Sequence, residues 1–186
     1  MDKPKNYYRN TYHHVYNRGV ERCEIFFDDK DYIYFLKRLE HYKNKYNISI
    51  ICYCLMPNHF HLFVKQLSDE LTVGKFIGDL TNSYTKATNK RYQRDGVLLQ
   101  GPTKTKPVED SNYFSWLTKY VLMNPVKARL ALRPDEWKYS CVKDYFGKSN
   151  GSLIDKDVIE SQFNSLSEFR SFIEEPNDTF NYDVFF

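Results

Sequence analysis

Residues 48–66, ISIICYCLMPNHFHLFVKQ, predict a β-hairpin. Residues 48–55 are a nearly continuous apolar run, as expected of a central strand buried on both faces. After a short turn at residues 56–58, residues 59–66 alternate between an apolar face and a face that carries His59 and His61. Two strands joined by so short a turn are expected to pair antiparallel.

Strands and helices alternate on either side of this hairpin. Turn residues, helix caps and apolar periodicity predict strands at residues 11–18 and 103–109 and helices at residues 28–46, 72–92 and 112–123. The first of these helices is expected to bury Ile33, Leu36, Leu39 and Tyr42. The order β-α-β-β-α-β-α is typical of an α+β, ferredoxin-like domain, an antiparallel sheet with helices against one face. The opposite face is then left available for a functional site.

Charge divides the chain into a basic body and an acidic tail. Residues 1–148 carry 25 Lys and Arg against 16 Asp and Glu, whereas residues 149–186 carry 2 against 8. We predict one domain over residues 1–148 and an acidic extension over residues 149–186, with short helices at 155–163 and 167–173. A basic body is common in nucleic-acid-binding proteins because Lys and Arg neutralise phosphates. A solvated basic surface is the alternative.

The composition excludes several classes of protein. With 186 residues, 41% of them hydrophobic and 27% charged, the chain can bury a core and is neither disordered nor low in complexity. Its apolar runs are too short for a membrane span, and its first residues lack a secretory signal. We therefore expect a cytoplasmic protein without a membrane partner, whose four cysteines are reduced thiols.

Two pairs of side chains could carry chemistry. His59 and His61 point to the same face of a strand, so their imidazoles could share one cation; two partly exposed surface histidines are the alternative. Tyr120 and Asn124 are four residues apart on a helix, so a phenol and an amide oxygen could be presented together. Pro125 disfavours helical geometry at Asn124, and the helix is expected to end or kink there.

Cys52 and Cys54, which lie close to His59 and His61 in the sequence, raise the alternative of a zinc site. Structural zinc sites generally pair their ligands across a loop, at gaps of roughly two to four residues. A Cys-x-Cys pattern inside an apolar strand more often supplies small buried side chains. We therefore favour buried thiols over zinc ligands.

Four segments resemble the REP-associated tyrosine transposases, bacterial single-tyrosine members of the HUH nuclease superfamily related to the IS200-like transposases. They occur in the family's order, from Tyr12 to Gly147, with a weaker likeness over residues 153–173. The segments are YHHVYNRG (12–19), YCLMPNHFHLFV (53–64), YVLMNPVKARL (120–130) and WKYSCVKDYFG (137–147).

The resemblance implies a ferredoxin-like fold and a cut-and-rejoin activity on single-stranded DNA. His59 and His61 match the family's metal-binding pair, Tyr120 its nucleophile, and Asn124 the polar residue that completes the metal site. The implied cofactor is Mg²⁺ or Mn²⁺, which would polarise the scissile phosphodiester. The implied reaction forms a 5′-phosphotyrosine and releases a 3′-hydroxyl, without ATP.

Contacts with DNA are predicted from charge and from the resemblance. Gln100 and Gly101 match a family signature, although Pro102 stands where arginine is frequent. Tyr84, Tyr92 and Tyr113 could stack on unpaired bases, and Lys119 is expected to be a phosphate contact or a solvated charge. The predicted DNA-binding residues are Arg18, Lys86, Lys90, Arg91, Arg94, Gln100, Lys104, Lys106, Lys127 and Arg129.

The sequence therefore predicts a metal-dependent single-strand endonuclease and strand transferase that acts on hairpin, REP-like DNA. The main alternative is a non-cleaving protein, recruited by the host, that binds DNA hairpins. A domain that binds other proteins is the third possibility. We expect a monomer, with a homodimer as the alternative, located in the cytoplasm with the bacterial nucleoid.

Overall fold

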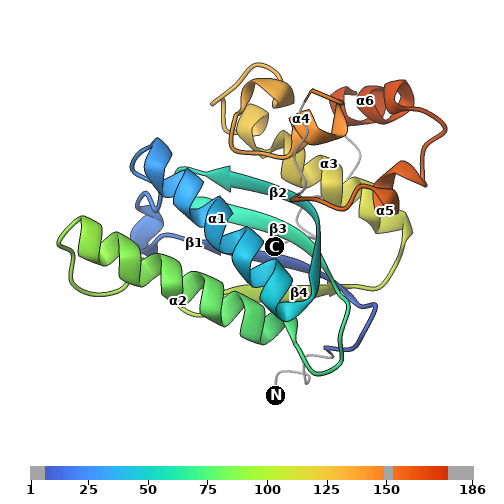
Figure 1. Ribbon diagram of the computed structural model, residues 1–186. Helices are drawn as coiled ribbons and strands as arrows, with labels where there is room; N and C mark the ends of the chain where they lie inside the picture. The colour runs from blue at the N-terminus through green and yellow to red at the C-terminus, as the bar shows by residue number, and fades with distance from the viewer. Residues whose placement is uncertain (1–6, 149–152, 176–186) are drawn as a thin grey trace.

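The computed structural model describes residues 7–148 and 153–175 and contains one antiparallel sheet with the strand order β2-β3-β1-β4 (Figure 1). The chain order β1-α1-β2-β3-α2-β4 with this sheet order confirms the ferredoxin-like, α+β prediction. The strands are β1 (Tyr12–Arg18), β2 (Ile48–Met56), β3 (His59–Gln66) and β4 (Lys104–Val108). The long helices are α1 (Asp29–Tyr46), α2 (Val73–Arg91) and α3 (Asn112–Lys127).

The hairpin of β2 and β3 forms as predicted, with Met56 opposite His59 and an irregularity between Ile50 and Cys52. The expected central position of β2 was wrong, because β2 is an edge strand whose residues are nonetheless all buried. A later segment covers the edge: the amide of Leu55 donates to the carbonyl of Tyr139 at 2.9 Å. Capping an edge in this way satisfies its backbone groups and prevents pairing with another chain.

Helices cover both faces of the sheet. Figure 1 shows α1 and α2 side by side across one face, with α3 on the other. The face that we expected to remain open is therefore occupied by α3, which contacts β2 and β3. This helix does not end at Asn124 but continues through Pro125 to Lys127. One backbone hydrogen bond is lost at the proline, yet the amide of Ala128 still donates to the carbonyl of Asn124 at 2.9 Å.

The buried face of α1 differs from the prediction. Ile33 is 49% exposed, and Phe35 packs on Phe60 of β3 with ring centroids 5.2 Å apart. Apolar residues occupy every position from 32 to 36, so periodicity alone does not identify the buried stripe. Leu39 and Tyr42 are buried as predicted, and the packing of α1 against β2 and α2 buries Phe35 in place of Ile33. The buried apolar residues of α1 are Tyr32, Phe35, Leu39, Tyr42 and Tyr46.

The region after α3 folds into short helices. We predicted helices at residues 155–163 and 167–173, and the structure has α5 (Asp157–Glu160) and α6 (Leu166–Glu174). The shorter elements η1 (Val20–Arg22), η2 (Pro134–Glu136) and α4 (Val142–Tyr145) were not predicted. Residues 149–152 and 176–186 of the predicted extension lie outside the described residues, and its boundary stays a prediction. In the described part of the chain, no helix is both long and apolar enough to cross a membrane.

We expect the substitution Gly19→Ala to destabilise the fold. A Cβ at this position would lie 2.1 Å from the carbonyl oxygen of Cys23, so the turn after β1 would have to open. Overpacking of this kind lowers the free energy of unfolding by about 1–3 kcal/mol. Chemical denaturation of both proteins measures the difference.

Gly78→Ala is the matched control. Gly78 lies in α2, and no atom would come within 4 Å of its added Cβ. Alanine is a better helix former than glycine, so this variant should gain stability, by up to about 1 kcal/mol. Equal losses in the two variants would contradict the steric explanation for Gly19.

Candidate active site

Strand β3 places two imidazoles on the face of the sheet that α3 covers. His59 pairs with Arg18 of β1 and His61 with Tyr16, at the end of the sheet where β1 stops. The two imidazole centroids are 5.1 Å apart, while Phe60 points to the opposite face and packs on α1. The predicted alternation along β3 is therefore confirmed.

Helix α3 brings the phenol and the amide to the same place. The ring of Tyr120 packs edge-on against His61, with a centroid distance of 5.3 Å, and against His14 at 6.0 Å. One turn later, Asn124 donates its Nδ2 to the carbonyl of Tyr120 at 2.7 Å, and its side chain also hydrogen-bonds to His59. The structure thus unites the two pairs that the sequence singled out separately.

Burial determines the protonation of these groups. Burial lowers the pKa of His61 well below its ordinary value, and the neighbouring His14 and His59 lower it further. Burial also lowers the pKa of His59, against the hydrogen bond with Asn124. Both imidazoles are therefore neutral at pH 7, the state in which they bind metal ions. Burial raises the pKa of the Tyr120 phenol well above its usual value, so the resting tyrosine is protonated.

Two residues that sequence reasoning missed orient the imidazoles. Nδ1 of His61 lies 3.0 Å from Nε2 of His14, and Nδ1 of His59 lies 2.6 Å from Oδ1 of Asn58. Such outer contacts select the tautomer and the ring orientation of a histidine, and here both of them engage Nδ1 and not Nε2. Asn58 could have been noticed because it directly precedes His59, whereas His14 becomes adjacent only through the pairing of β1 with β3.

A cavity of about 540 Å³ opens in front of these groups. Arg18 and Gln100 meet across it, with the guanidinium Nε donating to Oε1 at 2.5 Å. Four predicted DNA-binding residues line it, namely Arg18, Gln100, Lys104 and Lys127. The other lining residues are Tyr16, Asn17, Arg22, Asn58, His59, His61, Asn124 and Ala128. The cavity is therefore rimmed by cations, with the histidine pair and the amide in its wall.

The basic end of α2 lies elsewhere. Arg91 forms ion pairs with Asp28 at 2.5 Å and Asp31 at 2.6 Å, so it joins α2 to α1 instead of facing the cavity. The predicted residues Lys86, Lys90, Arg94, Lys106 and Arg129 also lie outside the cavity wall. Of these, Lys106 is on the site's side of the sheet, paired with His14.

Two further expectations are corrected. Tyr84 is buried and its hydroxyl donates to the carbonyl of Ile25, so it cannot stack on a base. Lys119 is not solvated, because only 2% of it is exposed, and it does not line the cavity. Tyr92 donates its hydroxyl to Asp31 in the link between α1 and α2, and its stacking role stays a prediction. Tyr113 is 38% exposed, and its stacking role stays a prediction.

The cysteines do not join the histidines in a metal cluster. Cys52 and Cys54 are free, fully buried thiols, and burial raises the pKa of both. Cys54 pairs with His61 across the hairpin, but its sulfur contacts Sδ of Met56 at 3.7 Å. Among the described residues, no group of three or more His, Cys, Asp or Glu side chains could hold a metal ion.

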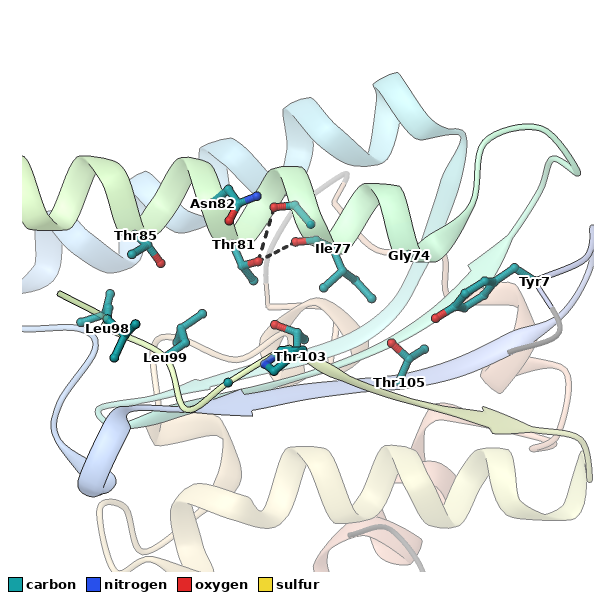
Figure 2. A pocket seen from close by; sticks show the side chains of 14 residues that line it. Tyr7, Gly74, Ile77, Thr81, Asn82, Thr85, Leu98, Leu99, Thr103 and Thr105 are labelled. Carbon is teal, nitrogen blue, oxygen red and sulfur yellow. Dashed lines mark hydrogen bonds between the residues drawn. The ribbon is translucent and has the colours of Figure 1, made fainter. Parts of the chain in front are cut away.

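A second cavity, of about 410 Å³, lies between α2 and the strand β4. Figure 2 shows that threonine, leucine and glycine positions line it, together with Tyr7. The hydroxyl of Thr81 donates to the carbonyl of Ile77 at 2.8 Å, within its own helix. None of the lining residues is His, Cys, Asp, Glu, Lys or Arg, so this cavity supplies neither a metal ligand nor a cation. The histidine cavity is the candidate site.

The sequence model of a known family, described as "Transposase IS200 like", matches residues 6–124, a range that ends on Asn124. The chain belongs to the IS200-like transposase family. Membership implies an enzyme of the nuclease and strand-transfer type. No curated protein matches the sequence.

Solved structures support the fold of this transposase. A REP-associated tyrosine transposase bound to a REP hairpin matches with a TM-score of 0.66 and 14% identity, over 83% of this chain and 98% of that chain. A Deinococcus radiodurans R1 protein matches with a TM-score of 0.45 and 14% identity, over 65% and 95% of the two chains. A bacterial tRNA(His) guanylyltransferase-like protein in complex with GTP reaches 0.40 and 14%, over 68% of each. The last two likenesses carry no weight in the assignment.

Lys127 of this transposase should titrate near neutral pH. Burial and the charge of Lys119 lower its pKa to about 8, and its ammonium lies 5.5 Å from the centroid of the Tyr120 ring. The site therefore carries this positive charge below pH 8 and loses it above. Competitive acetylation followed by peptide mass spectrometry measures the pKa of each lysine. Lys45, whose pKa is raised by its ion pair with Asp79, is the control and should react only at higher pH. Identical pH profiles for the two lysines would contradict this assignment.

Proposed function

We propose that this transposase is a metal-dependent endonuclease and strand transferase that cuts single-stranded DNA next to a hairpin, with Tyr120 as nucleophile. The observation that carries the proposal is the convergence of a phenol, two neutral imidazoles and an amide beside one cation-rimmed cavity, with the imidazoles and the amide in its wall and the Tyr120 ring packed against His61. A phenol and a metal-binding pair are the groups that such a reaction needs, and phosphates are attracted by the surrounding cations.

The donor set suits a divalent cation. Nε2 of His59 and of His61 would supply two nitrogen ligands, and Oδ1 of Asn124 a third, oxygen ligand, since its Nδ2 is engaged with Tyr120. Oxygen and imidazole ligands together favour Mn²⁺ or Mg²⁺ with positions open to phosphate. When bound, the metal would polarise the scissile phosphodiester and offset its developing charge.

The attacking group comes from the chain itself. Tyr120 is protonated at rest, so its phenol has to give up its proton to water before it attacks. The phenolate oxygen then attacks phosphorus, forming a bond to the 5′-phosphate and breaking the bond to the 3′ oxygen, which takes up a proton and leaves as a hydroxyl. A second strand's 3′-hydroxyl reverses the step. Because Tyr120 is only 3% exposed, the reaction includes a movement of the phenol toward the cavity.

Hairpin DNA is the substrate that the comparisons favour. The REP-associated transposase of similar fold is bound to a REP hairpin. Here Arg18, Lys104 and Lys127 line the cavity and would neutralise the backbone of the strand that enters it. We propose that the protein acts as a monomer, because each group of the proposed site comes from the same chain.

We expect the purified protein to form a covalent adduct with labelled single-stranded hairpin oligonucleotides from its gene's flanks. The adduct should survive a denaturing gel, require Mn²⁺ or Mg²⁺, and disappear with EDTA. Tyr120→Phe should abolish it, since the attacking oxygen is removed. The matched control is Tyr34→Phe on α1, which makes the same change at a partly exposed tyrosine outside the site and should retain the adduct.

His59→Ala and His61→Ala separate cleavage from binding. Both should lose the adduct while retaining salt-sensitive hairpin binding, because the cations that hold the backbone are unchanged. Tight binding without any adduct from the unmodified protein would overturn the nuclease and favour the non-cleaving hairpin-binding protein. An adduct retained in Tyr120→Phe would overturn the choice of nucleophile.

A further inference from the structure

Lys119, the residue before Tyr120, is a buried lysine on the opposite side of α3. Tyr120 faces the sheet and His61, whereas the Lys119 side chain faces α6. Only 2% of the lysine is exposed, and burial lowers its pKa. A buried ammonium destabilises a fold unless it is compensated by hydrogen bonds or charge, so its partners identify what it does.

Those partners are the carbonyl groups at the end of α6. The ammonium donates to the carbonyl of Phe172 at 2.5 Å and to that of Glu175 at 2.8 Å. Glu175 directly follows α6, so both carbonyls belong to the helix's last turn and to the residue that caps it. The last carbonyls of a helix lack partners within the helix and carry a partial negative charge, which a cation satisfies.

Aromatic rings enclose the same ammonium. It lies 4.8 Å from the ring centroid of Phe172 on α6 and 5.6 Å from that of Trp116 on α3. These two rings also contact each other, with centroids 5.0 Å apart. The lysine thus occupies the centre of the contact between α3 and α6.

Two outer contacts flank this centre. The hydroxyl of Ser115 on α3 donates to Oε1 of Gln162, and Arg133 forms an ion pair with Glu174 at 3.4 Å. Both are exposed, so each contributes little stability. Gln162 precedes α6 and Arg133 follows α3, whereas the hydrogen bonds of Lys119 join α3 directly to the end of α6.

Contacts on two opposite sides of α3, with the sheet and with α6, fix the position of this helix. Its inner side places Tyr120 against the imidazoles, and its outer side is held by α6 through the adjacent residue. We propose that Lys119 is a positioning residue, through which α6 holds α3 at the depth where Tyr120 meets the histidine pair. The effect of Lys119 on cleavage rests on the proposed function. Its effect on the position of α3 does not depend on that function.

The test is Lys119→Met in the full-length protein. Methionine is long enough to fill the space between the rings but cannot donate to the carbonyls. The stability control is Leu39→Ala, which removes fully buried side-chain atoms from α1 on the other face of the sheet. Both variants are compared well below their unfolding midpoints, by hairpin affinity, by the single-turnover rate of adduct formation, and by hydrogen exchange of residues 120–124.

A positioning role predicts a change confined to the reaction step. In Lys119→Met, hairpin affinity should stay within about twofold, while adduct formation slows by about tenfold or more, because a displaced nucleophile rarely reaches its attack geometry. Residues 120–124 should exchange faster together with α6. Leu39→Ala should change neither the rate nor this exchange.

Two outcomes would overturn the inference. If Lys119→Met forms the adduct at the wild-type rate and the hydrogen exchange of residues 120–124 is unchanged, Lys119 only stabilises the fold and does not position Tyr120. Equal losses of rate in both variants would show a general effect of destabilisation. If the unmodified protein forms no adduct, the proposed function fails, and the hydrogen-exchange comparison alone decides whether Lys119 holds α3.

Discussion

The packing of α3 against β1 and β3 is the contact on which the site depends. It is an unusual helix–sheet contact, because an aromatic phenol meets imidazoles from two strands where aliphatic side chains would be ordinary. Buried polar groups of this kind are tolerated only when their partners are in place. His14, Asn58 and Asn124 provide those partners, so the site's polar groups and the docking of α3 are parts of one arrangement.

The same burial explains the chemical state of the site. Removal from water keeps the imidazoles neutral and the Tyr120 phenol protonated. The cations remain at the rim, where Arg18 and Lys127 face the cavity. The site is therefore divided into a neutral wall and a positive rim, and the Lys127 ammonium on that rim lies 5.5 Å from the centroid of the Tyr120 ring.

The segment after α3 extends this arrangement beyond the sheet. It covers the edge of β2 near Tyr139, and its last helix contacts the outer side of α3 at Lys119. The faces of β2 are buried by α1 and α3, so the strand is apolar on both of them although it lies at the edge of the sheet. The region after α3 thus determines the surroundings of both the hairpin and the tyrosine helix.

The sequence by itself determined the order of the elements, the hairpin, and the pairing of His59 with His61 and of Tyr120 with Asn124, because these depend on spacing within one strand or helix. Only the tertiary structure decided that the two pairs meet, that His14 joins them, and that Lys119 and Arg91 bind other groups of the protein. The reason is physical: periodicity specifies which side of an element a residue occupies, whereas strand order and helix docking decide what lies opposite it. The edge position of β2, the burial of Lys119 and the ion pairs of Arg91 all depend on strand order and helix docking.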